Sequence, residues 1–233
     1  MFFSTSEVWG HRGWPSRFPD NTVAGIRAAA TVAAGVEIDI RASADGRLVL
    51  SHDPDLGGLD VAGAEWAELA LVDLAGHRPA LLDDVLDIGV ALDLEVKNDP
   101  AEPGFDPAHR LARHVADRAR PQDVVTSFWW PSMDAVRSTH PDVRTGLLVW
   151  GPVDPQAAIR HAVDHGHSVV APEGVLIDAD FMTLAVIEGL EVVAWTVDSV
   201  PEAMRLASLG VDAIISNRPG ELIAEDPTAR NPA

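Results

Sequence analysis

The sequence predicts a single-domain α/β protein with the (β/α)8 barrel fold, also called a TIM barrel. Strand-type and helix-type segments alternate from one end of the chain to the other, which is typical of a parallel sheet with crossover helices. The strand-type segments number eight, and eight such units close into a barrel. The 233 residues also match one barrel of ~250 residues, so we assign residues 1–224 to it and predict a disordered tail over 225–233.

The strands are recognised as short apolar runs that precede helix-type stretches. Charged residues enter some of them at alternate positions, as in the run VEIDIR. The predicted strands are 7–11, 36–41, 90–96, 123–127, 143–149, 167–171, 191–197 and 211–215.

Capping residues and helix breakers delimit several of the helices. Asn21 and Thr22 offer capping side chains ahead of an Ala-rich segment, and Gly35 stands where that helix should end. Pro131 and Pro201 suit the first turn of a helix, where no intrahelical N–H is needed. The predicted helices are 21–34, 81–88, 106–119, 131–139, 154–165, 178–188, 200–209 and 219–224.

One connection is expected to differ from the others. Asp45-Gly46 lies between two extended runs and predicts a tight hairpin turn after the second strand. Residues 54–80 are richer in glycine, and we expect an irregular excursion there before the third strand of the barrel.

The composition excludes several classes of protein. Seventeen basic against 36 acidic residues give a net charge of −19, which argues against a nucleic-acid partner and against docking by charge on an anionic membrane. The absence of cysteine excludes disulfides, Cys-based zinc sites and thiol nucleophiles. Neither a signal peptide nor an apolar run of ~18 residues is visible, so we expect no transmembrane segment and a cytoplasmic protein.

Acidic residues follow the predicted strands in a pattern that indicates a metal site. Glu37 and Asp39 are two residues apart on one strand, so their side chains share a face, and Glu95 lies near the carboxyl end of the next barrel strand. Carboxylates at one level of a barrel repel each other unless a cation lies between them. Three such oxygen donors describe a site for Mg²⁺ or Ca²⁺.

Basic residues accumulate at the same ends of the strands. His11 and His52 are suited to proton transfer near neutral pH. Arg12 and Lys97 are suited to holding a phosphate, which a chain of this negative charge would otherwise repel. A metal, two cations and two histidines together indicate cleavage of a phosphoryl ester.

The sequence resembles the glycerophosphodiester phosphodiesterase family in motifs that run in order across nearly the whole chain. The spacing from the first motif, through the acidic pair, to the His-Asp pair is specific. The matching segments are HRG at 11–13, PDNT at 19–22, GVEIDIRASADGRLVLSHD at 35–53, LEVK at 94–97, TSF at 126–128, AWTVD at 194–198 and VDAIISNRP at 211–219.

The resemblance implies a (β/α)8 barrel that hydrolyses glycerophosphodiesters to glycerol 3-phosphate and an alcohol. It implies that His11 and His52 are the acid–base pair. It also implies that Glu37, Asp39 and Glu95 are the metal ligands. The assignment of base and acid between the histidines stays open, and so does the nucleophile, which is water or the glycerol 2-hydroxyl.

The same resemblance assigns the remaining site residues. Arg12 and Lys97 are implied to be phosphate contacts, and Trp195 is implied to line the substrate pocket. The implied cofactor is one divalent cation, Mg²⁺ or Ca²⁺, with Mn²⁺ as an alternative. The implied partner is a small-molecule glycerophosphodiester; the head group and the oligomeric state stay open.

Three positions depart from the usual family pattern. Asp20 stands where the family usually has Glu, and Ser43 replaces a Thr in the hairpin. Ser216-Asn217 replaces the usual Thr-Asp near the last strand, which removes a carboxylate at that position. These departures bear on the choice of substrate more than on the chemistry.

Other functions are compatible with the same residues. The first is a lysophospholipase D-type activity on longer lipids. The second is a non-catalytic barrel that binds a phosphodiester or a metal, although paired histidines argue against a pure binder. The third is a barrel isomerase or lyase that acts on a sugar phosphate.

Some conspicuous residues are given structural interpretations. Asp93 shares the face of Glu95, and we expect it to form a structural salt bridge. His161 and His165 share a helix face near His167, but no third ligand is obvious in the sequence, so we expect a solvated helix surface. An aromatic group could form an apolar wall for the substrate or pack helices on the barrel; its members are Trp14, Phe128, Trp129, Trp130 and Trp150.

Overall fold

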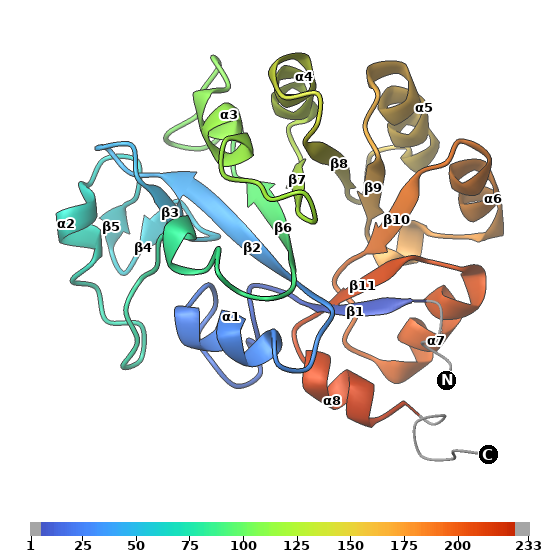
Figure 1. Ribbon diagram of the computed structural model, residues 1–233, viewed down its shortest axis with the longest axis horizontal. Helices are drawn as coiled ribbons and strands as arrows, with labels where there is room; N and C mark the ends of the chain where they lie inside the picture. The colour runs from blue at the N-terminus through green and yellow to red at the C-terminus, as the bar shows by residue number, and fades with distance from the viewer. Residues whose placement is uncertain (1–5, 227–233) are drawn as a thin grey trace.

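The computed structural model describes residues 6–226, and within them eight parallel strands close into a barrel (Figure 1). The first strand pairs with both the second and the last, which closes the cylinder. This arrangement confirms the predicted (β/α)8 barrel. The barrel strands are β1 (Glu7–Gly10), β2 (Gly35–Ala42), β6 (Ala91–Val96), β7 (Val124–Ser127), β8 (Arg144–Val149), β9 (Val169–Pro172), β10 (Glu191–Ala194) and β11 (Ala213–Ser216).

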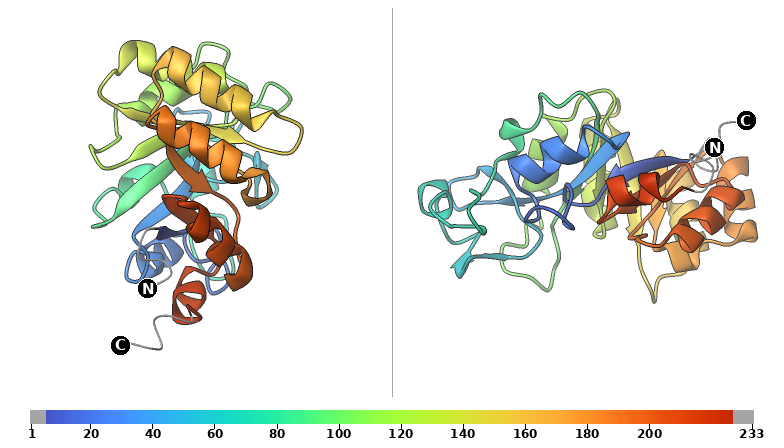
Figure 2. Two further views of the ribbon diagram at one scale, coloured as in Figure 1. Left: turned by 90° about the vertical axis from the view of Figure 1, so that its right-hand side faces the viewer. Right: turned by 90° about the horizontal axis from the view of Figure 1, so that it is seen from below.

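Helices cover the outside of the barrel, as the views in Figure 2 show. The predicted cap Thr22 is present: its hydroxyl accepts a hydrogen bond from the Gly25 N–H. A cap that was not predicted begins α5, where the Asp154 carboxylate accepts a hydrogen bond from the Gln156 N–H. The outer helices are α1 (Val23–Ala29), α3 (Arg110–Ala116), α4 (Trp130–Thr139), α5 (Pro155–His165), α6 (Ala179–Ile187), α7 (Val200–Leu209) and α8 (Pro219–Ala224), with a short 3-10 turn η2 (Gly174–Leu176) ahead of α6.

The predicted helix over 81–88 is wrong: the structure has only a 3-10 turn, η1 (Leu82–Asp84), there. The buried residues Leu82, Val85 and Ile88 are spaced by three, the period of a 3-10 helix rather than of an α-helix. The Asp84 carboxylate also accepts a hydrogen bond from the Leu81 N–H, which favours a tight turn.

Two other helices begin later than predicted. The helix predicted over 21–34 is α1, which begins at Val23 because Asn21 has a left-handed φ of 58° and Thr22 is the cap. The helix predicted over 106–119 is α3, which begins at Arg110. The Asp106 side chain accepts hydrogen bonds from the Ala108 N–H and the Leu111 N–H, which favours a turn before the helix.

The connection from β2 to β6 is the predicted excursion. Strand β3 (Leu48–Leu50) returns antiparallel to β2 through the expected turn, where Gly46 has a φ of 77° and its N–H donates to the Ser43 carbonyl. The pair β4 (Asp55–Leu56) and β5 (Leu59–Asp60) and helix α2 (Trp66–Leu69) follow. In Figures 1 and 2 this excursion projects on the side opposite α6 and α7.

The interior of the barrel is divided into two halves. Apolar side chains on the side of β7 to β11, among them Val169 and Val193, form an inner core. The side formed by β2 and β6 is lined instead by the carboxylates of Glu37, Asp39 and Glu95, which are buried. A polar site therefore lies against one wall of a barrel whose other wall is apolar.

No helix among residues 6–226 has both the length and the apolar character needed to span a membrane. The cytoplasmic location stays a prediction. Most of the predicted tail over 225–233 lies outside the described residues, so its disorder also stays a prediction.

Candidate active site in the mouth of the barrel

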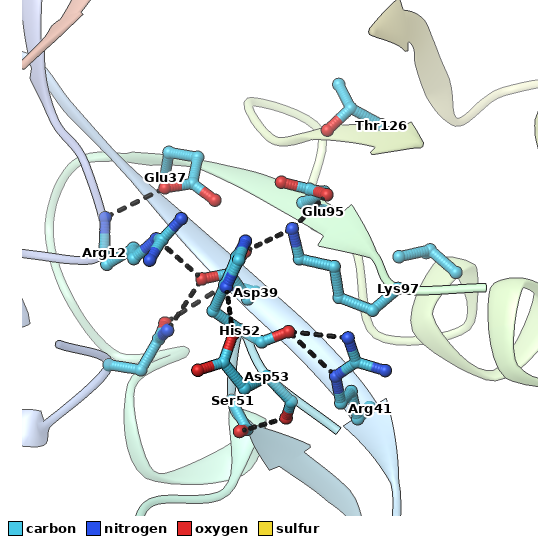
Figure 3. Close-up of polar contacts among 12 residues, drawn as sticks. Arg12, Glu37, Asp39, Arg41, Ser51, His52, Asp53, Glu95, Lys97 and Thr126 are labelled. Carbon is cyan, nitrogen blue, oxygen red and sulfur yellow. Dashed lines mark hydrogen bonds and ion pairs between the residues drawn. The ribbon is translucent and has the colours of Figure 1, made fainter. Parts of the chain in front are cut away.

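The three predicted metal ligands lie side by side on two neighbouring strands (Figure 3). Asp39 on β2 is in register with Glu95 on β6, and Glu37 lies two residues earlier on β2. Alternation along the strands sends their neighbours Ile38 and Leu94 to the helix-facing core and the carboxylates inward. One oxygen from each carboxylate lies within 4.8 Å of the others. We call Glu37, Asp39 and Glu95 the acidic triad.

Two cations flank the acidic triad. The ammonium Nζ of Lys97 lies 2.8 Å from Asp39 Oδ1 and 2.5 Å from Glu95 Oε1. On the other side, Arg12 Nε lies 3.2 Å from Asp39 Oδ2, and the Arg12 backbone N–H donates to Glu37 Oε2 over 2.9 Å. Asp39 thus lies between a lysine and an arginine, both of which were predicted as phosphate contacts.

Burial and crowding shift the pKa values of the triad in opposite directions. Burial, together with the charges of Asp39 and Glu95, raises the pKa of Glu37 well above its usual value. Burial also raises the pKa of Glu95, to about 6. Burial acts on Asp39 in the same sense, but Lys97 and Arg12 outweigh it and lower the pKa of Asp39. Burial therefore disfavours the charged forms of Glu37 and Glu95, whereas the neighbouring cationic side chains favour the charged form of Asp39.

The acidic triad fits a divalent cation. Glu37 Oε1 is buried, and within residues 6–226 it has neither a hydrogen bond nor an ion pair. A buried carboxylate oxygen without a partner is costly unless a cation or a proton satisfies it. Three oxygen donors on two rigid strands are the ligands that Mg²⁺, Ca²⁺ and Mn²⁺ prefer.

His11 is held in a defined orientation by residues that the sequence analysis did not combine. Its Nδ1 lies 2.7 Å from Asn217 Oδ1, and Asn217 donates through Nδ2 to Asp198 Oδ2 over 2.7 Å. Because the amide presents its oxygen to the ring, His11 carries its proton on Nδ1 and leaves Nε2 free to accept one. This Nε2 lies 3.8 Å from Glu37 Oε2.

These contacts show how Ser216-Asn217, which replaces the usual Thr-Asp of the family, is held in place. Asn217, which stands where the family carboxylate is missing, is held by Asp198, and the Asp198 carboxylate also accepts hydrogen bonds from the Ser216 hydroxyl and the Asn217 N–H. Burial, followed by the charge of Arg12, lowers the pKa of His11 and favours the neutral ring. Asp198 lies in the AWTVD motif, but only the fold shows its connection to His11.

His52 follows β3 on the other side of the triad. Its Nδ1 lies 2.7 Å from the Asp53 carboxylate, while Arg41 donates two hydrogen bonds to its backbone carbonyl. Arg41 in turn forms an ion pair of 2.7 Å with Glu102. The loop that carries His52 is therefore anchored to β2, and its side chain lines the main pocket.

The pocket beside the triad has a volume of about 630 Å³. Trp195 lies in its wall, where the indole N–H donates to the Ala171 carbonyl and the Phe128 ring meets it edge-on at 5.3 Å. Trp129 and Trp150 complete the aromatic lining. Glu95, Lys97 and His52 contribute the polar side of the same pocket.

Two members of the aromatic group pack elsewhere. Trp14 is buried, and its indole N–H donates to Glu221. Trp130, the first residue of α4, donates its indole N–H to the Leu148 carbonyl. Phe128, Trp129 and Trp150 line the pocket, and for them the substrate-wall interpretation stays a prediction. The packing interpretation applies to Trp14 and Trp130.

The expected salt bridge of Asp93 is absent from the part of the chain that the structure describes. Asp93 instead accepts a hydrogen bond of 2.6 Å from the Thr126 hydroxyl, and burial raises its pKa to about 7. It is in register with Glu37, so a protonated Asp93 limits the negative charge behind the triad.

The two remaining departures have local roles. Asp20 pairs with Arg12 over 3.2 Å, which helps to aim the guanidinium at Asp39. The Ser43 hydroxyl donates to Asp45 in the hairpin turn. Asn21, which sequence reasoning treated only as a capping residue, donates through Nδ2 to Asp39 Oδ2 over 2.7 Å.

Comparison with known proteins identifies the family. The sequence pattern of the glycerophosphoryl diester phosphodiesterase family matches residues 11–221. A glycerophosphodiester phosphodiesterase from Caldanaerobacter subterraneus subsp. tengcongensis is 26% identical over 93% of this chain and 96% of its own length.

Solved structures show the same fold. A candidate glycerophosphoryl diester phosphodiesterase from Silicibacter pomeroyi has a TM-score of 0.82 at 26% identity, covering 94% of this chain and 92% of that one. A phosphodiesterase from Oleispira antarctica, solved in complex with the product sn-glycerol-3-phosphate, has a TM-score of 0.81 at 22% identity, covering 94% and 96%. With its match over residues 11–221, the chain belongs to the glycerophosphoryl diester phosphodiesterase family, a family of phosphoric diester hydrolases.

Proposed function

We propose that this protein is a metal-dependent enzyme that hydrolyses glycerophosphodiesters to glycerol 3-phosphate and an alcohol. The observation that carries the proposal is the buried acidic triad, flanked by Arg12 and Lys97 and placed beside a pocket that His52 lines. Family membership supports this reaction, and a product of the same kind is bound in the Oleispira antarctica relative.

Glu37, Asp39 and Glu95 would hold the divalent cation. A cation bound there supplies positive charge that polarises a phosphate oxygen and stabilises the transition state. Arg12 and Lys97 bind the other phosphate oxygens, Arg12 as a planar fork and Lys97 as a point charge. Lys97 lines the pocket and is suited to this role because its four-carbon stem lets the ammonium turn from the carboxylates towards a substrate.

The histidines divide the proton transfers. His11 acts as the base, because its proton is on Nδ1 and its free Nε2 can take the proton of the attacking hydroxyl. The oxygen of that hydroxyl bonds to phosphorus as the bond to the alcohol breaks. His52 is the acid and gives its proton to the leaving alkoxide. The attacking hydroxyl belongs to water or to C2 of the glycerol, and the second route passes through a cyclic phosphate.

The test is release of glycerol 3-phosphate from glycerophosphocholine, measured with Mg²⁺, Ca²⁺, Mn²⁺ or EDTA. We expect release only with a divalent cation, and its loss in His11→Ala and in Glu95→Ala. His114→Ala, at a half-buried position of α3, is the matched control and should keep full activity. Rapid-quench sampling that traps a cyclic phosphate would assign the glycerol hydroxyl as nucleophile. Binding of the diester without turnover under any metal would overturn the proposal in favour of a non-catalytic barrel.

A second candidate is a lysophospholipase D-type activity, which the aromatic lining of the 630 Å³ pocket favours. Trp129 and Trp150 could hold an apolar tail that glycerophosphocholine lacks. Comparing lysophosphatidylcholine with glycerophosphocholine at equal concentration decides between the two. Faster turnover of the lysolipid, slowed by Trp150→Ala, would favour the second candidate.

A further inference from the structure

A second group of metal-type ligands lies on the outer helices, apart from the barrel mouth. His161 and His165 stand on α5, and the fold brings Asp134 of the neighbouring helix α4 to them (Figure 1). One ligand atom from each of the three lies within 4.8 Å of the others. No third ligand for the histidine pair was recognised in the sequence, because Asp134 lies 27 positions before His161. We call Asp134, His161 and His165 the helix-layer cluster.

We propose that the helix-layer cluster binds a divalent transition metal ion of the zinc type and so links α4 to α5. Two imidazoles and one carboxylate are a ligand set typical of Zn²⁺, with a fourth position open to water. Imidazole nitrogen also favours Zn²⁺, Cu²⁺ or Ni²⁺ over Mg²⁺. The proposal is independent of the catalytic function argued above.

Metal binding requires the His165 ring to turn, because the in-plane lone pairs of two nearly parallel imidazoles do not converge on one ion. His161 Nε2 already lies 2.9 Å from Asp134 Oδ1, and the rings of His161 and His165 stack at 4.0 Å with 12° between their planes. Zinc bonds of ~2.0 Å in a tetrahedron place ligand atoms about 3.3 Å apart. His165 is exposed, so its ring is free to make the adjustment.

The groups around the cluster orient its ligands. His165 Nδ1 lies 3.0 Å from the His161 carbonyl. A carbonyl only accepts hydrogen bonds, so Nδ1 carries the proton, and the lone pair of Nε2 in the neutral ring is the one that could bind a metal. His167 is buried; its Nδ1 meets the Thr145 hydroxyl at 2.8 Å and its Nε2 meets Asp134 Oδ1 at 3.0 Å. His167 therefore holds the carboxylate in place, as the outer partners of zinc ligands commonly do.

The site is partly shielded from solvent. Asp134 and His161 are half-buried, and the Trp130 ring packs against His161 at 5.1 Å. This indole provides a reporter, because a bound Cu²⁺ ion would quench its fluorescence.

The experiment is equilibrium dialysis of the full chain against Zn²⁺ in a large excess of Mg²⁺, which competes with Zn²⁺ for the oxygen ligands of the acidic triad. We expect one equivalent of Zn²⁺ to bind. We expect at least about tenfold weaker binding in His161→Ala, His165→Ala and the nearly isosteric Asp134→Asn. His114→Ala, a single histidine removed from another helix, is the matched control and should bind as the wild type does.

Fluorescence provides an independent reading. Cu²⁺ should quench the wild-type protein, and Trp130→Phe should remove part of that quenching while Zn²⁺ binding persists. Zn²⁺ binding that is absent from the wild type in excess Mg²⁺, or that is unchanged in all three ligand variants, would overturn the proposal. Circular dichroism in EDTA identifies any variant that has lost its fold, and the remaining variants then decide.

Discussion

The acidic triad and the helix-layer cluster each gather three potential metal ligands, but under opposite physical conditions. The triad is buried, offers oxygen alone and lies within 3.2 Å of two cations. The helix-layer cluster is partly exposed and offers two imidazoles and one carboxylate, and its carboxylate, Asp134, is hydrogen-bonded to His161 and to the neighbouring His167.

The contrast between the two sites comes from burial, because a buried carboxylate keeps its charge only next to a cation. Burial, together with neighbouring carboxylates, raises the pKa values of Glu37 and Glu95, so their charged forms are favoured only when a cation lies beside them. The helix-layer cluster is stable without a metal, because solvent and hydrogen bonds satisfy it. Cation binding in the barrel mouth should therefore control activity, whereas binding on the helix layer should control local stability.

The largest expected effect is on the rate of hydrolysis, which should depend on the acidic triad and not on the helix-layer cluster. Glu95→Ala should lower the release of glycerol 3-phosphate by roughly 10³-fold, because the reaction loses charge stabilisation that acts in the transition state. His165→Ala should leave the rate within about twofold of wild type, since surface changes away from the reaction rarely affect it. Steady-state assays of both variants in Mg²⁺ measure the contrast. Equal losses in the two would contradict the division between the sites.

A second prediction concerns the proton-accepting role of His11. Asn217→Asp would place a carboxylate 2.7 Å from Nδ1 and so raise the pKa of His11. A base must be unprotonated to act, so the acidic limb of the kcat/KM profile should move to higher pH, by about one unit. An unchanged limb would exclude His11 as the base, provided that the variant still turns over substrate.

A third prediction uses the stability of the metal-free protein. Burial raises the pKa of Asp93 in the folded chain from 3.8 to about 7. Between these two values the folded state keeps a proton that the unfolded state releases, so the free energy of unfolding falls as pH rises through that window. Asp93→Asn should remove up to about 1.4 kcal/mol per pH unit of that slope. Urea unfolding in EDTA across the window checks this, and an equally steep slope in the variant would contradict it.

The smallest effect is the stabilisation of the helix layer by zinc. Saturating Zn²⁺ in excess Mg²⁺ should raise the Tm of the wild type by about 5 °C, because the ion binds only the folded arrangement of α4 and α5. The shift should vanish in His161→Ala and persist in His114→Ala. Differential scanning calorimetry measures it; a shift of equal size in His161→Ala would place the zinc elsewhere.

Local patterns in the chain were enough to predict the fold and the core of the candidate site. The alternation in VEIDIR and DLEVK predicts which residues share a face, and the structure brings Glu37, Asp39 and Glu95 together. Family motifs added His11, His52, Arg12, Lys97 and Trp195, and the structure places all five around the triad or in the pocket wall.

Other features were beyond a reading of local pattern. The segment 81–88 has enough apolar residues for a helix, but the structure has only a 3-10 turn there, which the hydrogen bond from the Leu81 N–H to the Asp84 carboxylate favours. Asp93 was expected to meet a cation, but its side chain accepts a hydrogen bond from the Thr126 hydroxyl on β7 instead.

Local sequence was therefore enough to predict the order of strands and helices, which side chains share a face of a strand, and which residue types lie at the carboxyl ends of the strands. Those properties follow from backbone periodicity and capping, which act over a few residues. Only the tertiary structure decided that Asn217 orients His11, 206 positions away, and that Asp134 joins His161 and His165. Such contacts depend on closure of the barrel and on the packing of neighbouring helices, which bring together atoms whose separation along the chain carries no local signal.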